Sequence, residues 1–359
     1  MNSGPMRILM VLCSGLLFLL LLLGLLLPAP AVVQANENPA DASPASPDGD
    51  AISLIDTLAD FVQGTPNNVV LHTPGSATLD WNWWLDGRVN EISTDSKFSP
   101  HTTWIISPTG TLTDTTWLAV WADERQADHS PDIFLARSNN RGRTWSPDVL
   151  VIDACDPDDP PYPDCPAHYS PDLAARPQDN SLWVIWQQEE SGSGADTGNI
   201  YYAASGDLGS TWPVTGTVTT AAGKQHWPRI AATRSTLYTI WESERTDNGD
   251  IEISRYNPDT DSGWSTPIAV SDDTSGKEQR TPALAADTAG NLYAVWTDFR
   301  ADDDGQIYFS RWLSGTTWAD GAWSAAVRLS DASADWGTDP DIKASPDGSI
   351  YAAWVERVP

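Results

Sequence analysis

The segment Tyr293-Ala-Val-Trp296 is one of five copies of a short apolar phrase that ends in tryptophan. The spacings between successive tryptophans are 65, 55, 55 and 58 residues, and these residues are Trp121, Trp186, Trp241, Trp296 and Trp354. A proline and an apolar strand precede most copies, and two further strands separated by a turn follow the first four. Four short strands per repeat predict an all-β fold, a β-propeller of four-stranded blades.

The two ends of the chain are expected to complete one blade together. The chain stops two strands into the fifth copy, after Trp354. Near the start, residues 68–72 align with residues 306–310, and residues 87–93 align with residues 323–330. We therefore expect five blades, with N-terminal outer strands pairing with C-terminal inner strands, because this removes two open sheet edges. A six-bladed ring is the alternative.

The first 64 residues do not resemble the repeat. Residues 8–27 form an apolar run after Arg7, and small residues end at Ala35, so residues 1–35 are interpreted as a signal peptide. The run is also long enough to be an uncleaved membrane anchor. Residues 36–64 are rich in Pro, Ala, Ser and Asp, and are expected to form a flexible linker. Residues 65–359 would then form the propeller, secreted or otherwise extracytoplasmic.

The formal net charge is −29, which argues against nucleic acid or an anionic membrane surface as a partner. Membrane contact is expected only through an uncleaved N-terminal segment, and we expect a monomer. Beyond the leader, Cys155 and Cys165 are the remaining cysteines. They bracket a proline- and aspartate-rich loop in an oxidising compartment, which predicts a disulfide between them.

The turns between third and fourth strands carry the most specific motif. Residues 205–212 read Ser-Gly-Asp-Leu-Gly-Ser-Thr-Trp, and residues 138–145 repeat this pattern with Asn in place of Asp. The shared positions are Ser138, Asn140, Gly142 and Trp145 in one copy, and Ser205, Asp207, Gly209 and Trp212 in the other. The acidic or amide side chain would accept hydrogen bonds from turn amides, and Gly would supply a positive φ. Degenerate copies end at Trp264 and Trp318.

These motifs resemble the Asp-box (BNR) repeats of the sialidase-like β-propellers, over residues 68–359. The resemblance implies a propeller whose Asp-box turns lie on the face opposite the functional site. Catalytic sialidases of this family have an Arg-Ile-Pro motif, three arginines that hold a substrate carboxylate, a Tyr–Glu nucleophile pair and an Asp acid. This sequence has no Arg-Ile-Pro; residues 228–230 read Pro-Arg-Ile.

Positions that differ between the repeats are free to bind a ligand. The residues directly after the strand prolines are expected to turn toward the central channel, and residues two before each proline to surround its mouth. The predicted ligand-binding set is His101, Tyr169, Asp172, His226, Arg229, Arg280 and Asp341. Cations and aromatic rings in this arrangement could bind a carboxylated sugar. A polar channel lining with ordered water is the alternative.

A second ring of polar residues follows the repeat tryptophans. Arg125, Arg245 and Arg300 each lie four residues after a tryptophan, with acidic residues nearby. Because they share one repeat position, we expect structural ion pairs. Glu189 and Glu190 replace this pattern in the second blade, and with Tyr169 they are the candidates for general acid–base or nucleophilic catalysis.

Two acidic loops could hold a calcium ion, and no other cofactor is expected. The candidate ligands are Asp247 and Asp250 in one loop, and Asp302 and Asp304 in the other. Neither loop has the full spacing of an EF-hand, and aspartate-rich turns are the alternative.

Three functions remain open. The first is a non-catalytic module that binds an extracellular glycan or protein. The second is a divergent exo-sialidase or related glycoside hydrolase, and the third is an architectural secreted domain. The missing Arg-Ile-Pro motif favours the first over the second.

Overall fold

The computed structural model describes residues 7–8, 11–13, 89, 97–105, 116–125, 130–140, 142–153, 166–189, 198–245, 249–301, 304–331 and 333–357. The chain divides into a unit made of Met1–Cys13 and Trp84–Pro359 and a second unit, Ser14–Trp83. The second unit lies outside the described residues, as do residues 68–72, Cys155, Cys165, Glu190, Asp247 and Asp302. Within the described part, no helix is both long and apolar enough to cross a bilayer.

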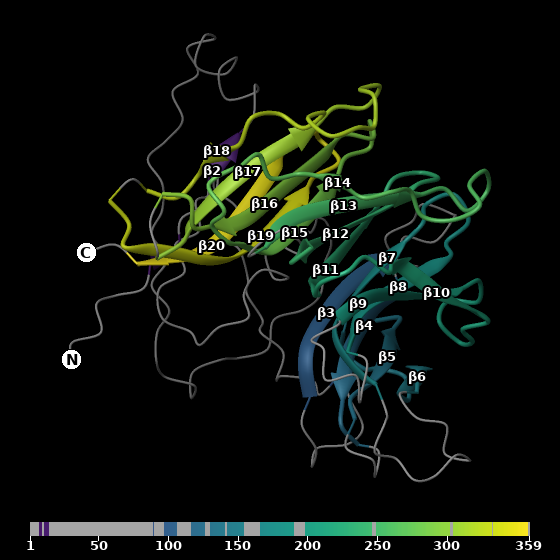
Figure 1. Ribbon diagram of the computed structural model, residues 1–359. Helices are drawn as coiled ribbons and strands as arrows, with labels where there is room; N and C mark the ends of the chain where they lie inside the picture. Colours follow the sequence, from purple (N-terminus) through teal and green to yellow (C-terminus); the bar gives the residue numbers. More distant parts are fainter. Residues whose placement is uncertain are drawn as a thin grey trace, which may run out of the picture. The chain divides into compact units, whose positions relative to one another are not determined.

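The described chain is all β, and its strands form four-stranded antiparallel sheets (Figure 1). The first sheet contains β3 (Lys97–Ile105), β4 (Thr116–Asp123), β5 (Asp132–Ser138) and β6 (Val149–Ile152). The second contains β7 (Ala167–Ala175), β8 (Leu182–Glu189), β9 (Gly198–Ser205) and β10 (Val214–Thr219). The third contains β11 (Gln225–Ala232), β12 (Leu237–Ser243), β13 (Asp250–Tyr256) and β14 (Ile268–Ala269). The fourth contains β15 (Gln279–Ala286), β16 (Leu292–Asp298), β17 (Gln306–Trp312) and β18 (Val327–Arg328).

The first strands of neighbouring sheets contact one another in chain order, β3 with β7, β7 with β11, β11 with β15, and β15 with β19 (Trp336–Ala344). Consecutive four-stranded sheets that meet through their first strands are the arrangement expected of propeller blades. The architecture therefore agrees with the fold class that the repeat predicts.

The second strand of each of the first four sheets carries the repeat tryptophan and is largely buried on both faces. All seven residues of β12 are buried, and Trp186, Trp241 and Trp296 are among the largest fully buried side chains. This strand lies between two others in its sheet, while side chains of the neighbouring sheets cover its two faces. Burying each indole removes a large apolar area from water, which contributes about 2–3 kcal/mol per side chain. The recurring phrase is therefore the packing signal of the fold.

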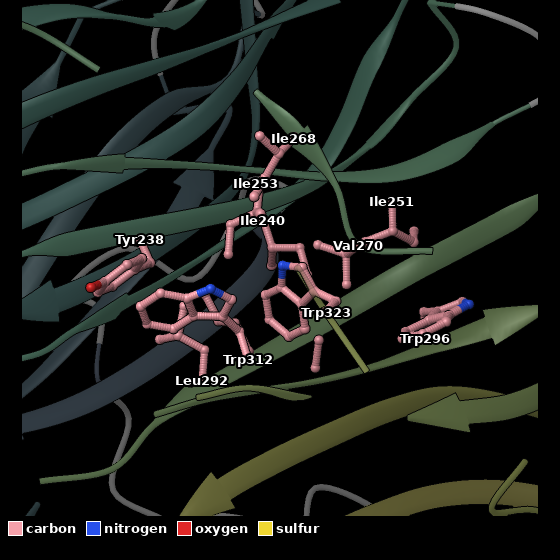
Figure 2. Close-up of a cluster of buried hydrophobic side chains, with 12 residues drawn as sticks. Tyr238, Ile240, Ile251, Ile253, Ile268, Val270, Leu292, Trp296, Trp312 and Trp323 are labelled. Carbon is pink, nitrogen blue, oxygen red and sulfur yellow. The ribbon is translucent and has the colours of Figure 1, made fainter. Parts of the chain in front are cut away.

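The core between the third and fourth sheets shows how the repeats pack (Figure 2). Ile240, Ile251 and Ile253 project from the third sheet, and Leu292 and Trp296 project from the fourth. Each face of a sheet thus buries its alternate residues against the adjoining sheet.

Each inner strand carries a β-bulge at its proline. The pairing register shifts between the residue two before the proline and the residue after it in β3, β7, β11, β15 and β19. Because of the extra residue, Tyr169 and Asp172 oppose Gln187 and Ile185, which lie on one face of β8. The residue directly before the proline has a positive φ in four of these strands: Ser170 (49°), Trp227 (45°), Thr281 (48°) and Asp339 (50°).

The two well-matched turns have the expected hydrogen bonds. The main-chain N–H groups of Ser210 and Thr211 donate to Oδ1 of Asp207 at 3.0 and 2.9 Å, and Ser205 Oγ accepts the N–H of Gly209 at 2.8 Å. Gly209 has a φ of +79°, and in the other copy Asn140 takes the place of Asp207.

The degenerate turn of the fourth sheet needs one correction. Ser310 Oγ donates to the carbonyl of Ser324 at 2.6 Å, just as Ser254 Oγ donates to Ser265 at 2.7 Å. The tryptophan equivalent to Trp264 is therefore Trp323, not Trp318. The motif spacing placed this tryptophan at Trp318 because the turn after Ser310 is longer than the turn after Ser254.

The last sheet is built differently. It contains β19 and β20 (Ile350–Arg357), and β20 also pairs with β1 (Arg7–Ile8) and β2 (Val11–Cys13). These short strands take the side of β20 that residues 68–72 were expected to occupy. Pairing by residues 68–72 stays a prediction because they lie outside the described part.

Candidate functional site

A cavity of about 570 Å³ lies among the five inner strands. Each strand contributes at least one polar side chain to its wall: His101, Asp172, Arg229, Thr281 and Asp341. Four of these residues directly follow a strand proline and the fifth, Thr281, directly precedes one, so the bulge determines which side chains reach the cavity. The cavity is the candidate functional site, because it is concave and polar groups from many elements converge on it.

The structure divides the seven predicted ligand residues into two groups. His101, Asp172, Arg229 and Asp341 line the cavity. The other three, Tyr169, His226 and Arg280, begin the same strands but do not line it. We call these three the rim residues. Ala283, at the fourth repeat position, is buried in the core instead.

Two carboxylates in the cavity, those of Asp172 and Asp341, accept hydrogen bonds from main-chain N–H groups. Asp172 accepts the N–H of Leu173 at 2.8 Å and, from the next sheet, the N–H of Ile230 at 2.9 Å. Asp341 accepts the N–H of Ile342 at 2.8 Å. Burial raises the pKa of Asp172, although Arg229 opposes this shift. Asp172 therefore links two neighbouring sheets, and its side chain is held in a fixed position in the cavity wall.

His101 faces these groups as a neutral ring. Its Nδ1 lies 3.6 Å from Oδ1 of Asp172. Burial lowers the pKa of His101 well below its usual value, and the positive charge of Arg229 lowers it further. A neutral imidazole offers one donor and one acceptor, which suits a hydroxyl group of a ligand.

The cations of the cavity have no carboxylate partner. Arg229 donates to the carbonyl of Pro228 at 3.1 Å, and neither Arg229 nor Lys343 forms an ion pair within the part of the chain that the structure describes. Both are nonetheless close enough to lower the pKa of Asp172. The same wall also carries the carboxyl groups of Asp172, Asp339 and Asp341, so cations and carboxylates share the cavity.

Among the lining residues that were not predicted from the sequence are Trp227, Thr281, Asp339 and Lys343. The first three stand directly before the strand prolines, one position from those that were chosen. The repeat could have shown them, because this position also differs between the blades. Lys343 lies two residues beyond Asp341 and therefore on the same side of β19.

The rim residues lie beside carboxylates. His226 Nε2 is 3.4 Å from Glu244, and Arg280 pairs with Glu278 at 2.5 Å. Burial raises the pKa of Tyr169, and the charges of Glu189 and Glu124 raise it further, so Glu189 is near the phenol. Glu189 itself accepts a hydrogen bond from Gln187 at 3.3 Å.

A buried carboxyl that was not predicted lies behind the rim. Glu242 is 3% exposed, and it accepts the N–H of Thr281 in the next sheet. Burial raises its pKa from 4.5 to about 8; Arg280 opposes the shift, while Glu244 and Glu278 add to it. The side chain is therefore neutral at pH 7. Its equivalent in the second sheet is Gln187, whose Oε1 lies 3.5 Å from the N–H of Trp227.

The three arginines after the tryptophans form structural ion pairs, as the repeat predicts. Arg125 pairs with Asp123 and Asp148, and Arg300 with Asp298 and Asp272. Arg245 pairs with Glu252, on the adjacent strand. These arginines are neutralised, so they are poorly suited to bind a substrate carboxylate.

The described residues contain no group of three or more His, Cys, Asp or Glu side chains that could hold a metal ion. Asp250 and Asp304 are described, whereas their loop partners Asp247 and Asp302 are not. Calcium binding and the Cys155–Cys165 disulfide both stay predictions.

Two solved structures with TM-scores above 0.5 support the fold. The Penicillium chrysogenum α-L-arabinanase complexed with arabinobiose is similar with a TM-score of 0.51 and 16% identity, over 71% of this chain and 74% of that chain. A protein of unknown function from Dyadobacter fermentans is similar with a TM-score of 0.53 and 12% identity, over 74% and 77%. The NanB sialidase of Streptococcus pneumoniae reaches a TM-score of 0.49 at 10% identity, over 74% and 58%. At such identities the likeness concerns the fold alone.

No family model matches the chain, and no curated protein sequence matches it. The site must therefore be interpreted from its own geometry.

Proposed function

We propose that this protein is an exported, non-catalytic module that binds a glycan in the cavity between its inner strands, with a carboxylate of the sugar on Arg229 and Lys343. The observation that carries the proposal is the pair of cations in the wall of the cavity, neither of which forms an ion pair within the part of the chain that the structure describes. The neutral ring of His101 and the acceptor oxygens of Asp341 supply hydrogen-bond partners for hydroxyl groups. The rim residues would contact a longer glycan or a protein that carries it.

The state of the carboxylates favours binding over catalysis. Both oxygens of Asp172 accept main-chain N–H groups, so this residue is poorly placed to transfer a proton. Glu242 is neutral at pH 7 but lies behind the rim and does not line the cavity.

A divergent glycoside hydrolase is the second candidate. It is favoured by one observation, the proximity of Glu189 to Tyr169, because a carboxylate beside a phenol could activate it as a nucleophile. Loss of turnover in Tyr169→Phe, with binding retained, would identify this activity.

The proposal can be tested with a glycan array that carries sialylated, uronate-containing and neutral glycans. The mature protein should bind carboxylated glycans, and Arg229→Ala should weaken binding at least about tenfold, since a charge-assisted pair contributes about 1.5–3 kcal/mol. Arg311→Ala is the matched control, because this exposed arginine lies on β17 outside the cavity. Equal binding by the wild type and Arg229→Ala, or no glycan bound, would contradict the proposal.

We also propose that the ring has five blades and closes through residues 68–93. In the mature protein without residues 1–35, the outer side of β20 would be free for residues 68–72. Asp172 in the second sheet binds the N–H of Ile230 in the third. Asp341 occupies the same repeat position as Asp172, and Thr102 the same position as Ile230. Asp341 would therefore accept the N–H of Thr102 when the last sheet packs against the first.

A further inference from the structure

Trp227 occupies a backbone position that is costly for a bulky residue. Its φ is +45°, in the left-handed region, and it stands directly before Pro228. The residue before a proline is normally confined to extended conformations, and a bulky side chain at positive φ is unusual. The equivalent positions in the other sheets carry small or short polar residues: Ser170, Thr281 and Asp339. The bulge itself therefore does not require an indole.

The indole is also not part of the buried hydrophobic core. Trp227 is half-buried and lines the cavity, whereas the repeat tryptophans are fully packed. Its indole N–H has no hydrogen-bond partner in the described part of the chain and is not among the enclosed polar atoms there. Its closest ring neighbour is His226 at the rim, with 5.5 Å between ring centroids. The indole is thus partly accessible from the cavity.

The surroundings specify what this ring can bind. Among the described lining residues, Trp227 is the sole Phe, Tyr or Trp, and Arg229 lies two residues farther along the same strand. The face of an indole carries partial negative charge, which attracts the weakly positive C–H groups on the apolar face of a pyranose ring. The free N–H can donate to a ring hydroxyl, while the guanidinium of Arg229 takes an anionic substituent.

We infer that Trp227 is the stacking platform for the sugar ring in this cavity, placed there by a strained bulge position that recurs in four of the inner strands. Backbone strain of this kind collects at ligand-binding positions, where the rest of the fold maintains it. The inference rests on the proposed glycan-binding function and adds to it the residue that selects a ring with an apolar face over an open-chain acid.

Trp227→Thr tests the platform, because Thr281 already adopts this conformation in the next sheet. The probes are D-glucuronate, N-acetylneuraminic acid, D-glucose and, as an open-chain acid, D-gluconate, with any glycan that binds on the array. We expect wild-type tryptophan fluorescence to change with cyclic acids and Trp227→Thr to bind them at least about tenfold more weakly. Trp227→Phe should keep part of the affinity.

A second readout separates a platform from a packing residue. The melting temperature of Trp227→Thr should stay within about 3 °C of the wild type, since the indole is only half-buried and Thr281 already adopts this backbone conformation in the next sheet. A much larger fall would mean that the indole is structural, and unchanged sugar affinity would mean that it does not contact the ligand; either result overturns the inference. If no sugar binds to the wild type, the proposed function fails, and the platform fails with it.

Discussion

Glu242→Gln should change how the stability of this protein depends on pH. The carboxyl is buried, its Oε2 has no hydrogen-bond partner within the described chain, and its pKa is raised from 4.5 to about 8. The equivalent residue of the second sheet is Gln187, which meets the N–H of Trp227 as Glu242 meets that of Thr281. A glutamine thus occupies the equivalent contact between two sheets, and its amide does not titrate in this pH range.

The sign follows from proton binding. Between pH 4.5 and about 8 the folded protein keeps a proton on Glu242 that the unfolded chain releases. Stability therefore falls as the pH rises through this window, by about 1.4 kcal/mol per pH unit and about 4 kcal/mol between pH 5 and 8. Glu242→Gln removes this term, so the variant and the wild type should be similarly stable near pH 5. Near pH 8 the variant should be more stable by about 4 kcal/mol.

Urea unfolding followed by tryptophan fluorescence at several pH values measures this difference directly. Comparing the variant with the wild type cancels the other titrating groups. Gln187→Glu is the reciprocal variant, and it should introduce the same pH dependence at the junction between the second and third sheets. Parallel stability curves for Glu242→Gln and the wild type across this pH range would refute the reasoning.

Three further predictions concern stability. His168 is buried, and burial lowers its pKa from 6.5 to about 4. Between these two pH values the histidine is protonated in the unfolded chain and neutral in the folded protein. His168→Gln should therefore reduce the loss of stability between about pH 6.5 and 4 by up to about 3 kcal/mol, as urea titrations would show. Arg176→Met should cost about 1 kcal/mol, because Asp179 and Asp259 lose their ion-pair partner but remain partly exposed to water, and Arg176→Lys should recover only part of this in the same assay. Ser205→Ala should lower the free energy of unfolding by about 1–2 kcal/mol, because the turn amides lose their acceptor; a melting temperature equal to the wild type would contradict this.

Much of the architecture could be predicted because it depends on short sequence motifs that recur in each sheet. The tryptophan phrase marks a strand that is buried on both faces, and its spacing gives the length of a four-stranded sheet. The hydrogen bonds at Asp207 and Asn140 follow from the turn sequence, since each joins residues at most four apart. Trp323 was missed because a longer turn broke the local spacing.

The candidate site was predicted only in part. Four of the residues after the strand prolines, His101, Asp172, Arg229 and Asp341, line the cavity, and their role in ligand binding stays a prediction. Alternation along a strand could not reveal the β-bulge, which brings Trp227 and Thr281 into the wall as well. Nor could it show that Glu242 is buried beside Arg280, because that burial depends on the contact between two sheets.

The sequence by itself determined the class of fold, the length of the repeat and the turns that join its strands, because those features arise from contacts between near neighbours in the chain. Only the tertiary structure decided which polar side chains share one cavity and which carboxyls lose their charge. Both depend on residues more than 50 positions apart, such as Asp172 and Ile230, and on the water that is excluded when the sheets pack together.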